Sequence, residues 1–236
     1  MDTLPMTTED VTRDPYALLR LLQLVSPALP VGAYTYSEGL ETLVQAGQMT
    51  DAAGLQSWLE QELRYGAIRV EGAIALRAYH CTQQEDLTGL SNWNHWLSAF
   101  RETEELRQQS WQMGRSLTRL LLDLDPQLRD PIQACGDPCH FAIAFAIAAA
   151  RWNIDPHSAL LGYLQSWATN LVNAGVKLIP LGQTAGQQIG LALHPRLVAA
   201  VDDILLMPDN ALDCCSWGVA IASMTHETLY SRLFRS

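Results

Sequence analysis

The most compact group of soft metal ligands in the sequence consists of Cys135, Cys139 and His140. Thiolates and an imidazole at this spacing could bind a late transition metal. However, the two cysteines do not form a C-x-x-C motif and no second cysteine pair lies nearby, which also suits core or loop residues. The sequence therefore leaves two interpretations open: a helical metal-binding protein or metalloenzyme that uses this cluster, and a purely structural segment.

Common catalytic signatures do not occur in the sequence. There is no Walker loop, no G-x-S-x-G elbow, no H-E-x-x-H motif and no dinucleotide-binding fingerprint. Gly182, Gly186 and Gly190 recur every four residues, but this stretch lacks the lysine and the preceding strand of a phosphate-binding loop. The sequence therefore predicts that the chain is not an enzyme and has no catalytic residues.

Two other features have side chains that could contact a partner. Lys177 lies in the apolar run AGVKLIPL, where its ammonium group must snorkel to solvent, pair with an anion, or face water or a partner. The C-terminal stretch TLYSRLFRS mixes large apolar side chains with Arg232 and Arg235. Because chain ends usually fray, we expect residues 227–236 to become ordered on a partner.

Helical periodicity extends over most of the chain, which predicts an all-α fold. We expect a single-domain, compact bundle of about ten helices over residues 14–236, preceded by a disordered segment at 1–13. Asp14-Pro15 and Asp155-Pro156 are typical helix starts, with an N-cap acid before a proline. The segment HFAIAFAIAAARW is apolar on all sides and should form the central helix.

The stretch from Leu21 to Glu41 predicts a turn between two helices, because Pro27 and Pro30 prevent the first helix from continuing. The first helix should place Leu18, Leu19, Leu22 and Val25 on one apolar face. The second should cover residues 37–46.

Several other boundaries follow from capping and helix-breaking residues. Thr50 should cap a third helix. Gly66 and Gly72 either divide two helices or kink a single long one. The stretch from Asp125 to Pro138 is predicted to form a loop. His194-Pro195 should restart a helix, and the glycines from 182 to 190 predict close helix packing, either within the fold or across a dimer.

Composition excludes several classes of partner. A formal net charge of -10 and a pI near 4.9 argue against binding to nucleic acid, which requires clustered basic residues. The acidic N-terminal stretch lacks the apolar region of a secretory signal, and no apolar run is long enough for a bilayer span. We therefore expect a cytoplasmic protein with no membrane partner.

Five blocks of sequence resemble the UreF family of urease accessory proteins. The opening turn LQLVSPALPVGAYTYSEGLE is similar to the family's N-terminal signature. In the same order follow QMGR at 112–115, CHFA at 139–142, VKLIPLGQ at 176–183 and the terminal HETLYSRLFRS. The mild departures are Ala33, Thr35 and Tyr36, where the family often has other residues. The resemblance extends from about residue 19 to the end.

The resemblance implies an all-helical, homodimeric urease maturation factor. Proteins of this family join UreD (also called UreH) and the GTPase UreG into a complex that delivers nickel to apo-urease. The resemblance also suggests that nickel passes through this complex as cargo, with no resident cofactor, and that GTP hydrolysis by UreG is modulated.

Site residues implied by the resemblance fall into two sets. The UreG-facing or dimer-proximal set is Lys177, Pro180, Gly182 and Gln183, with Arg107 and Arg115 as possible charge stabilisers for the GTPase. The UreD-facing set is Leu22, Pro30, Gly32, Tyr36, Ser37, Glu41, Tyr230, Arg232, Leu233, Phe234 and Arg235.

Overall fold

Helices and the turns between them make up all the described part of the chain. The computed structural model describes residues 14–236, so the disorder predicted for residues 1–13 lies outside this range. Within it there is no β-strand, which confirms the all-α prediction. The α-helices are α1 Pro15–Leu24, α2 Leu40–Gln45, α3 Ala52–Tyr65, α4 Ala67–Gln83, α5 Leu87–Phe100, α6 Glu104–Leu124, α7 Arg129–Cys135, α8 Phe141–Arg151, α9 Pro156–Leu178, α10 Gln183–Leu205 and α11 Trp217–His226. Short 3-10 helices cover Ala33–Thr35, Pro126–Leu128 and Asp209–Ala211.

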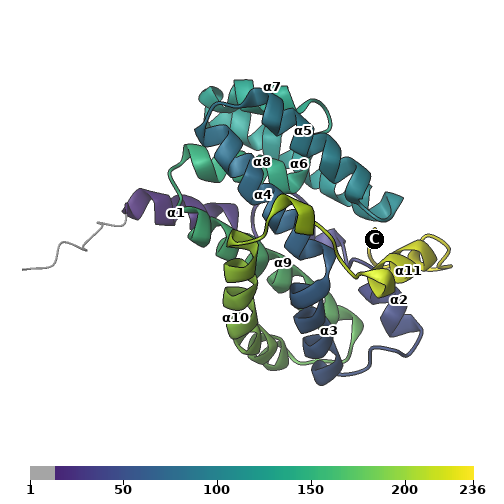
Figure 1. The fold of residues 1–236 in the computed structure, drawn as a ribbon. Coiled ribbons are helices and arrows are strands. Elements are labelled where there is room, and N and C mark those ends of the chain that lie inside the picture. The colour runs from purple at the N-terminus through teal and green to yellow at the C-terminus, as the bar shows by residue number, and fades with distance from the viewer. Residues whose placement is uncertain (1–13) are drawn as a thin grey trace, which may run out of the picture.

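The apolar helix α8 lies at the centre of the upper bundle, where α4 and α6 pack against it and α5 and α7 lie beside it (Figure 1). Every residue from Ala142 to Ala150 is buried. This confirms the prediction that HFAIAFAIAAARW forms the central helix. None of the helices in residues 14–236 has both the length and the apolar character needed to cross a bilayer.

A second group of helices, α3, α9 and α10, packs below this bundle (Figure 1). α9 begins as predicted, because the carboxylate of Asp155 accepts the N–H of Ser158 at 2.9 Å and Pro156 occupies the first turn. α1 packs on α9 through Leu21 and Leu24, while α11 packs on α2 near the C-terminal residues. Helices α1 and α11 thus pack on the outside of the bundle.

The structure corrects two of the predicted boundaries in the first half. Asp51, not Thr50, caps α3, since its carboxylate accepts the N–H of Gly54 at 2.8 Å. A carboxylate one residue further along competes successfully with the threonine hydroxyl. Gly66 divides α3 from α4, whereas Gly72 lies inside α4.

Two predictions in the second half are also wrong. Pro195 does not restart a helix but lies inside the continuous helix α10. Pro195 and Leu191, whose carbonyl loses its helical donor, are both exposed, so water can bond that carbonyl. The expected loop from Asp125 to Pro138 contains α7, a helix of seven residues that its short length and flanking prolines concealed.

The apolar face predicted for α1 is not the face that packs on the core. Leu18, Leu19 and Leu22 are each more than half exposed, while Leu21 and Leu24 are buried. A short helix with leucine on most sides can pack against the core with either set of leucines. The exposed set is therefore available for contact with another molecule.

Candidate protein-docking surface

The C-terminal residues lie against the opening turn of the same chain. The backbone N–H and the hydroxyl of Ser37 both donate to the carbonyl of Ser236, at 2.6 and 2.7 Å. The N–H of Arg235 donates to the carbonyl of Thr35 at 2.8 Å. The sequence predicted that this segment orders on a partner, but here its last residues are seated on the chain itself. The backbone groups that make these contacts have no signature in the sequence.

Glu41 is the main receptor for this segment. Its side chain is 3% exposed, and its two carboxylate oxygens accept the N–H groups of Leu233 at 2.7 Å and Phe234 at 2.9 Å. The Nε2 atom of His226 lies 3.2 Å from the same carboxylate. Glu41 therefore joins α2 to the C-terminal segment and is not accessible to a partner in this arrangement.

The structure divides the predicted UreD-facing residues into two sets. Those buried at the junction of the opening turn and the C-terminal segment are Tyr36, Ser37, Glu41 and Phe234. Those exposed at the surface are Leu22, Pro30, Tyr230, Arg232, Leu233 and Arg235. Gly32 is partly exposed and has a φ of 75°, a left-handed conformation that the turn requires and that glycine adopts readily. The exposed set could contact a partner without rearrangement, and this role stays a prediction.

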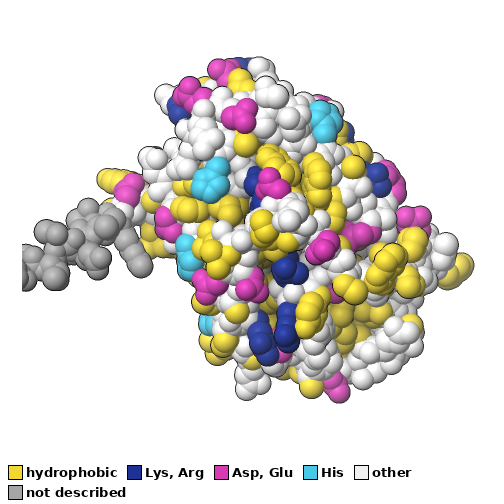
Figure 2. Space-filling view, viewed as in Figure 1, with side chains coloured by type: hydrophobic (Ala, Val, Ile, Leu, Met, Phe, Trp, Pro, Cys, Tyr) yellow, Lys and Arg dark blue, Asp and Glu magenta, His cyan; other side chains and the backbone are white. Residues whose placement is uncertain are grey.

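Sequence reasoning missed an exposed apolar stripe on α11. Trp217, Ile221 and Met224 are 75%, 58% and 53% exposed, and their spacing of four and three residues places them on one face of the helix. Hydrophobic side chains gather over this part of the surface (Figure 2). The spacing was visible in the sequence, but only the packing shows that Val219 takes the buried side.

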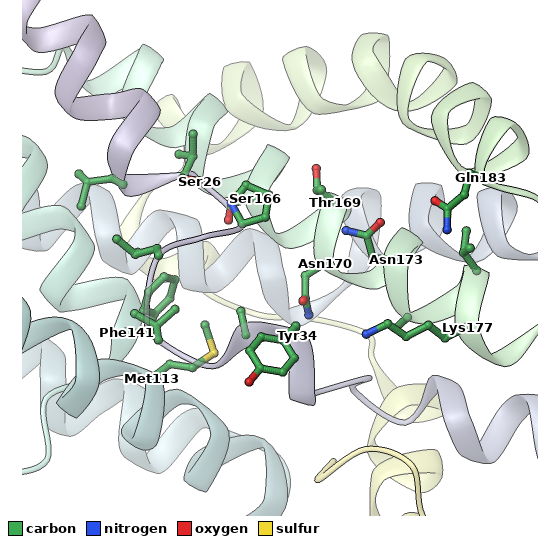
Figure 3. Close-up of a pocket in the computed structure, with 18 residues that line it drawn as sticks. Ser26, Tyr34, Met113, Phe141, Ser166, Thr169, Asn170, Asn173, Lys177 and Gln183 are labelled. Atoms are coloured by element: carbon green, nitrogen blue, oxygen red, sulfur yellow. The ribbon is translucent and has the colours of Figure 1, made fainter.

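Lys177 lies at the mouth of a groove of about 210 Å³ between the opening turn and α9 (Figure 3). Its Nζ atom is 6.0 Å from the ring centre of Tyr34 and 5.6 Å from that of Phe234. The side chain is exposed. Of the alternatives that the sequence left open, the structure selects a solvent-facing ammonium group beside two aromatic rings, a favourable cation–π arrangement.

The other residues predicted to face UreG or the dimer partner lie in the turn from α9 to α10. Pro180, Gly182 and Gln183 are all exposed. A Cβ atom added at Gly186 would lie 2.9 Å from Val176, whereas one added at Gly182 or Gly190 would meet no atom within 4 Å. Close packing within the fold therefore explains only one of the three glycines.

The two arginines proposed as charge stabilisers are paired with acids of their own chain. Arg107 lies 3.6 Å from Glu104 and Arg115 lies 3.1 Å from Asp137. The Arg115–Asp137 pair lies at the surface, where an ion pair contributes little and exchanges readily, whereas the Arg107 side chain is only 29% exposed. An action on a GTPase stays a prediction for both residues.

The side chains of the candidate metal cluster form hydrogen bonds within their own chain. His140 is fully buried, with Nδ1 2.9 Å from the Ser110 hydroxyl and Nε2 accepting from the indole N–H of Trp111 at 2.9 Å. Burial, with smaller contributions from two nearby arginines, lowers the pKa of His140 to about 3.

The two thiols of this cluster are also unsuited to a metal. The Cys135 thiol donates to the carbonyl of Pro131 at 3.3 Å. A hydrogen bond with Cys135 and burial raise the pKa of Cys139 well above its usual range, which disfavours the thiolate that a metal needs. Residues 14–236 contain no group of three His, Cys, Asp or Glu side chains arranged for a metal ion. The arrangement of Cys135, Cys139 and His140 thus favours the structural interpretation, and metal binding by these residues stays an untested prediction.

A neutral, buried His140 predicts a specific dependence of stability on pH. Its pKa in the folded state is about 3 against an ordinary 6.5, so acidification below 6.5 favours the unfolded chain, which binds the proton. The raised pKa values of Glu62 and Glu71, both about 7, act in the opposite direction. The contribution of His140 therefore has to be isolated with the variant His140→Gln, which cannot titrate.

We expect the stability advantage of the wild-type chain over His140→Gln to shrink as the pH falls from 6.5 towards 3. Urea unfolding at several pH values measures this difference. A gap that stays constant over the range would contradict a neutral His140.

Large apolar side chains are exposed on α1, on α11 and in the C-terminal segment. Exposed apolar side chains that gather in this way are typical of a protein that binds other proteins. Comparison with known proteins gives the family. The UreF family profile matches residues 49–194. The chain belongs to the UreF family of urease accessory proteins.

Full-length relatives extend this assignment to both ends of the chain. A protein of Nostoc sp. named "Urease accessory protein UreF" is 56% identical over 236 residues, covering 100% of both chains. Proteins of the same name from Synechocystis sp. and Chromohalobacter salexigens are 53% and 41% identical, covering 93% and 98% of this chain and 98% and 100% of their own. The opening turn and the C-terminal segment, outside the profile match, are thus included in these alignments. Family membership implies a role in urease maturation as an accessory factor, not as a catalyst.

Proposed function

We propose that the chain is a cytoplasmic docking factor that joins UreD (UreH) to the GTPase UreG, so that nickel can be delivered to apo-urease. The observation that carries this proposal is the full-length similarity to urease accessory proteins in a chain whose exposed apolar side chains gather near its two ends. Nickel is cargo in this account, and the chain needs no cofactor of its own.

In this proposal the UreD-facing surface consists of exposed residues of α1, of the opening turn and of the C-terminal segment that is seated on that turn. Tyr230 and Leu233 are the largest apolar side chains of the C-terminal segment that point to solvent, with exposed fractions of 107% and 67%. Large apolar and aromatic side chains usually dominate the energy of protein interfaces. Arg232 and Arg235 place positive charge at the edge of the same surface.

The UreG-facing surface is the α9–α10 turn, with Lys177 beside it. An exposed ammonium group held near two rings suits an acidic partner surface. Arg107 and Arg115 would modulate GTP hydrolysis only after exchanging their present acid partners. Homodimerisation is part of the proposal, and Gly182, which lacks close neighbours, leaves room for a second chain.

Replacing the two exposed apolar residues of the C-terminal segment tests the UreD-facing surface. We expect the double variant Tyr230→Ala, Leu233→Ala to bind UreD at least about tenfold more weakly, because two interface anchors are lost. Thermal stability should hardly change, since both side chains are exposed. Affinity measured by calorimetry or by co-purification gives the result.

Leu206 provides a matched control, because it is 84% exposed and follows the end of α10. The variant Leu206→Ala should bind UreD like the wild type. Undiminished UreD binding by the double variant, or an equal loss in Leu206→Ala, would remove the C-terminal segment from the interface.

A further inference from the structure

His226 is a fully buried imidazole held between two carboxylates. It is 0% exposed. Its Nδ1 atom lies 3.0 Å from Oε2 and 3.2 Å from Oε1 of Glu105 on α6, and its Nε2 atom lies 3.2 Å from Oε2 of Glu41 on α2. The two contacts are on opposite sides of the ring, so they do not form a metal chelate.

The hydrogen-bonding capacity of the ring fits one protonation state better than the other. A neutral imidazole has one N–H donor and one lone pair, whereas the imidazolium has two donors. With ionised carboxylates on both sides, a neutral ring would direct its lone pair at an anionic oxygen, which is unfavourable. Two charge-assisted hydrogen bonds form only if both nitrogens carry a proton.

Both carboxylates also hold the C-terminal segment. Glu41 accepts the N–H groups of Leu233 and Phe234, and Oε1 of Glu105 lies 3.1 Å from Nη1 of Arg232. His226 therefore joins the two receptors of this segment. The other charged groups nearby, Glu104, Glu227 and Arg235, line the adjoining open groove together with Glu105.

We propose that His226 is a proton-dependent clasp for residues 227–236. With its second proton, the ring offsets the charge of the two carboxylates and keeps Glu41 oriented towards the segment. When the pH rises and the ring loses that proton, two carboxylates remain beside a neutral ring, and one of them loses a donor. Without this donor, Glu41 holds the N–H groups of Leu233 and Phe234 less firmly, and Phe234 leaves its buried position. The clasp does not depend on which protein binds the chain.

Side-chain and backbone NMR of the full chain tests the clasp directly. Nitrogen-15 shifts of His226 should report two protonated ring nitrogens in the seated state. Between about pH 5 and about pH 9, the seated signals of the Leu233 and Phe234 amides should fall at least tenfold in population. Amides of α8 should stay unchanged over the same range, which controls for global unfolding.

Two variants separate the clasp from other titrating groups. In His226→Gln the C-terminal amides should lose their dependence on pH. The control His157→Gln removes an exposed histidine that lies 3.9 Å from a single acid, Asp202, and should behave like the wild type. The proposal would be overturned by a ring that keeps one bare nitrogen in the seated state, by wild-type amides that do not respond to pH, or by an unchanged response in His226→Gln.

Discussion

Replacing Gly114 by alanine should lower the free energy of unfolding by at least about 3 kcal/mol, because it forces backbone against backbone. A Cβ atom at Gly114 on α6 would overlap the carbonyl oxygen of Cys139 and lie 2.9 Å from backbone atoms of His140 and Phe141. These backbone atoms have little freedom to move away. The Asn94 side chain accepts the N–H of His140 at 2.9 Å and donates to two carbonyls of the same loop.

Gly190 on α10 is a matched control for this substitution. A Cβ atom there would meet no atom within 4 Å, and the residue is helical. Gly190→Ala should therefore leave stability unchanged or raise it by up to about 1 kcal/mol, because alanine favours the helix. Urea unfolding of both variants gives the comparison. Equal stability of the two variants would contradict the close approach of α6 to the loop before α8.

The second large effect is expected for Glu41→Ala, at about 3–5 kcal/mol, because a buried charge network loses its centre. The change leaves the N–H groups of Leu233 and Phe234 without an acceptor and removes one of two carboxylates from His226. We also expect the C-terminal segment to become sensitive to limited proteolysis.

Glu104 is the corresponding control, since its carboxylate is 60% exposed and pairs with Arg107 at the surface. Glu104→Ala should change stability by no more than about 1 kcal/mol. A Glu41→Ala variant that unfolds at the wild-type urea concentration and resists protease equally well would contradict the role assigned to Glu41.

Local signals in the sequence were sufficient for much of the fold. The Asp-Pro starts at residues 14 and 155 and the apolar segment of α8 were predicted correctly, since capping and all-round apolarity depend on near neighbours. Pro195 was misjudged because its tolerance inside α10 depends on the exposure of that side of the helix. Helix boundaries that depend on tertiary context cannot be derived from local pattern.

The candidate site was predicted less completely than the fold, because its contacts also depend on tertiary context. Glu41 and Phe234 were both predicted to face UreD, yet both are buried where α2 meets the C-terminal segment. Nothing in the sequence near Glu41 indicates that its acceptors are used by residues more than 190 positions away. Nothing near His226 in the sequence marks it as a residue between two carboxylates, because these carboxylates come from two different helices.

The most direct test of the docking account is activation of apo-urease in vitro by purified UreD, UreG, nickel and GTP, with and without this chain. We expect active urease to form only when the chain is present, and the double variant Tyr230→Ala, Leu233→Ala to restore little of that activity. Urease that acquires nickel and activity equally well in the absence of the chain would contradict the account.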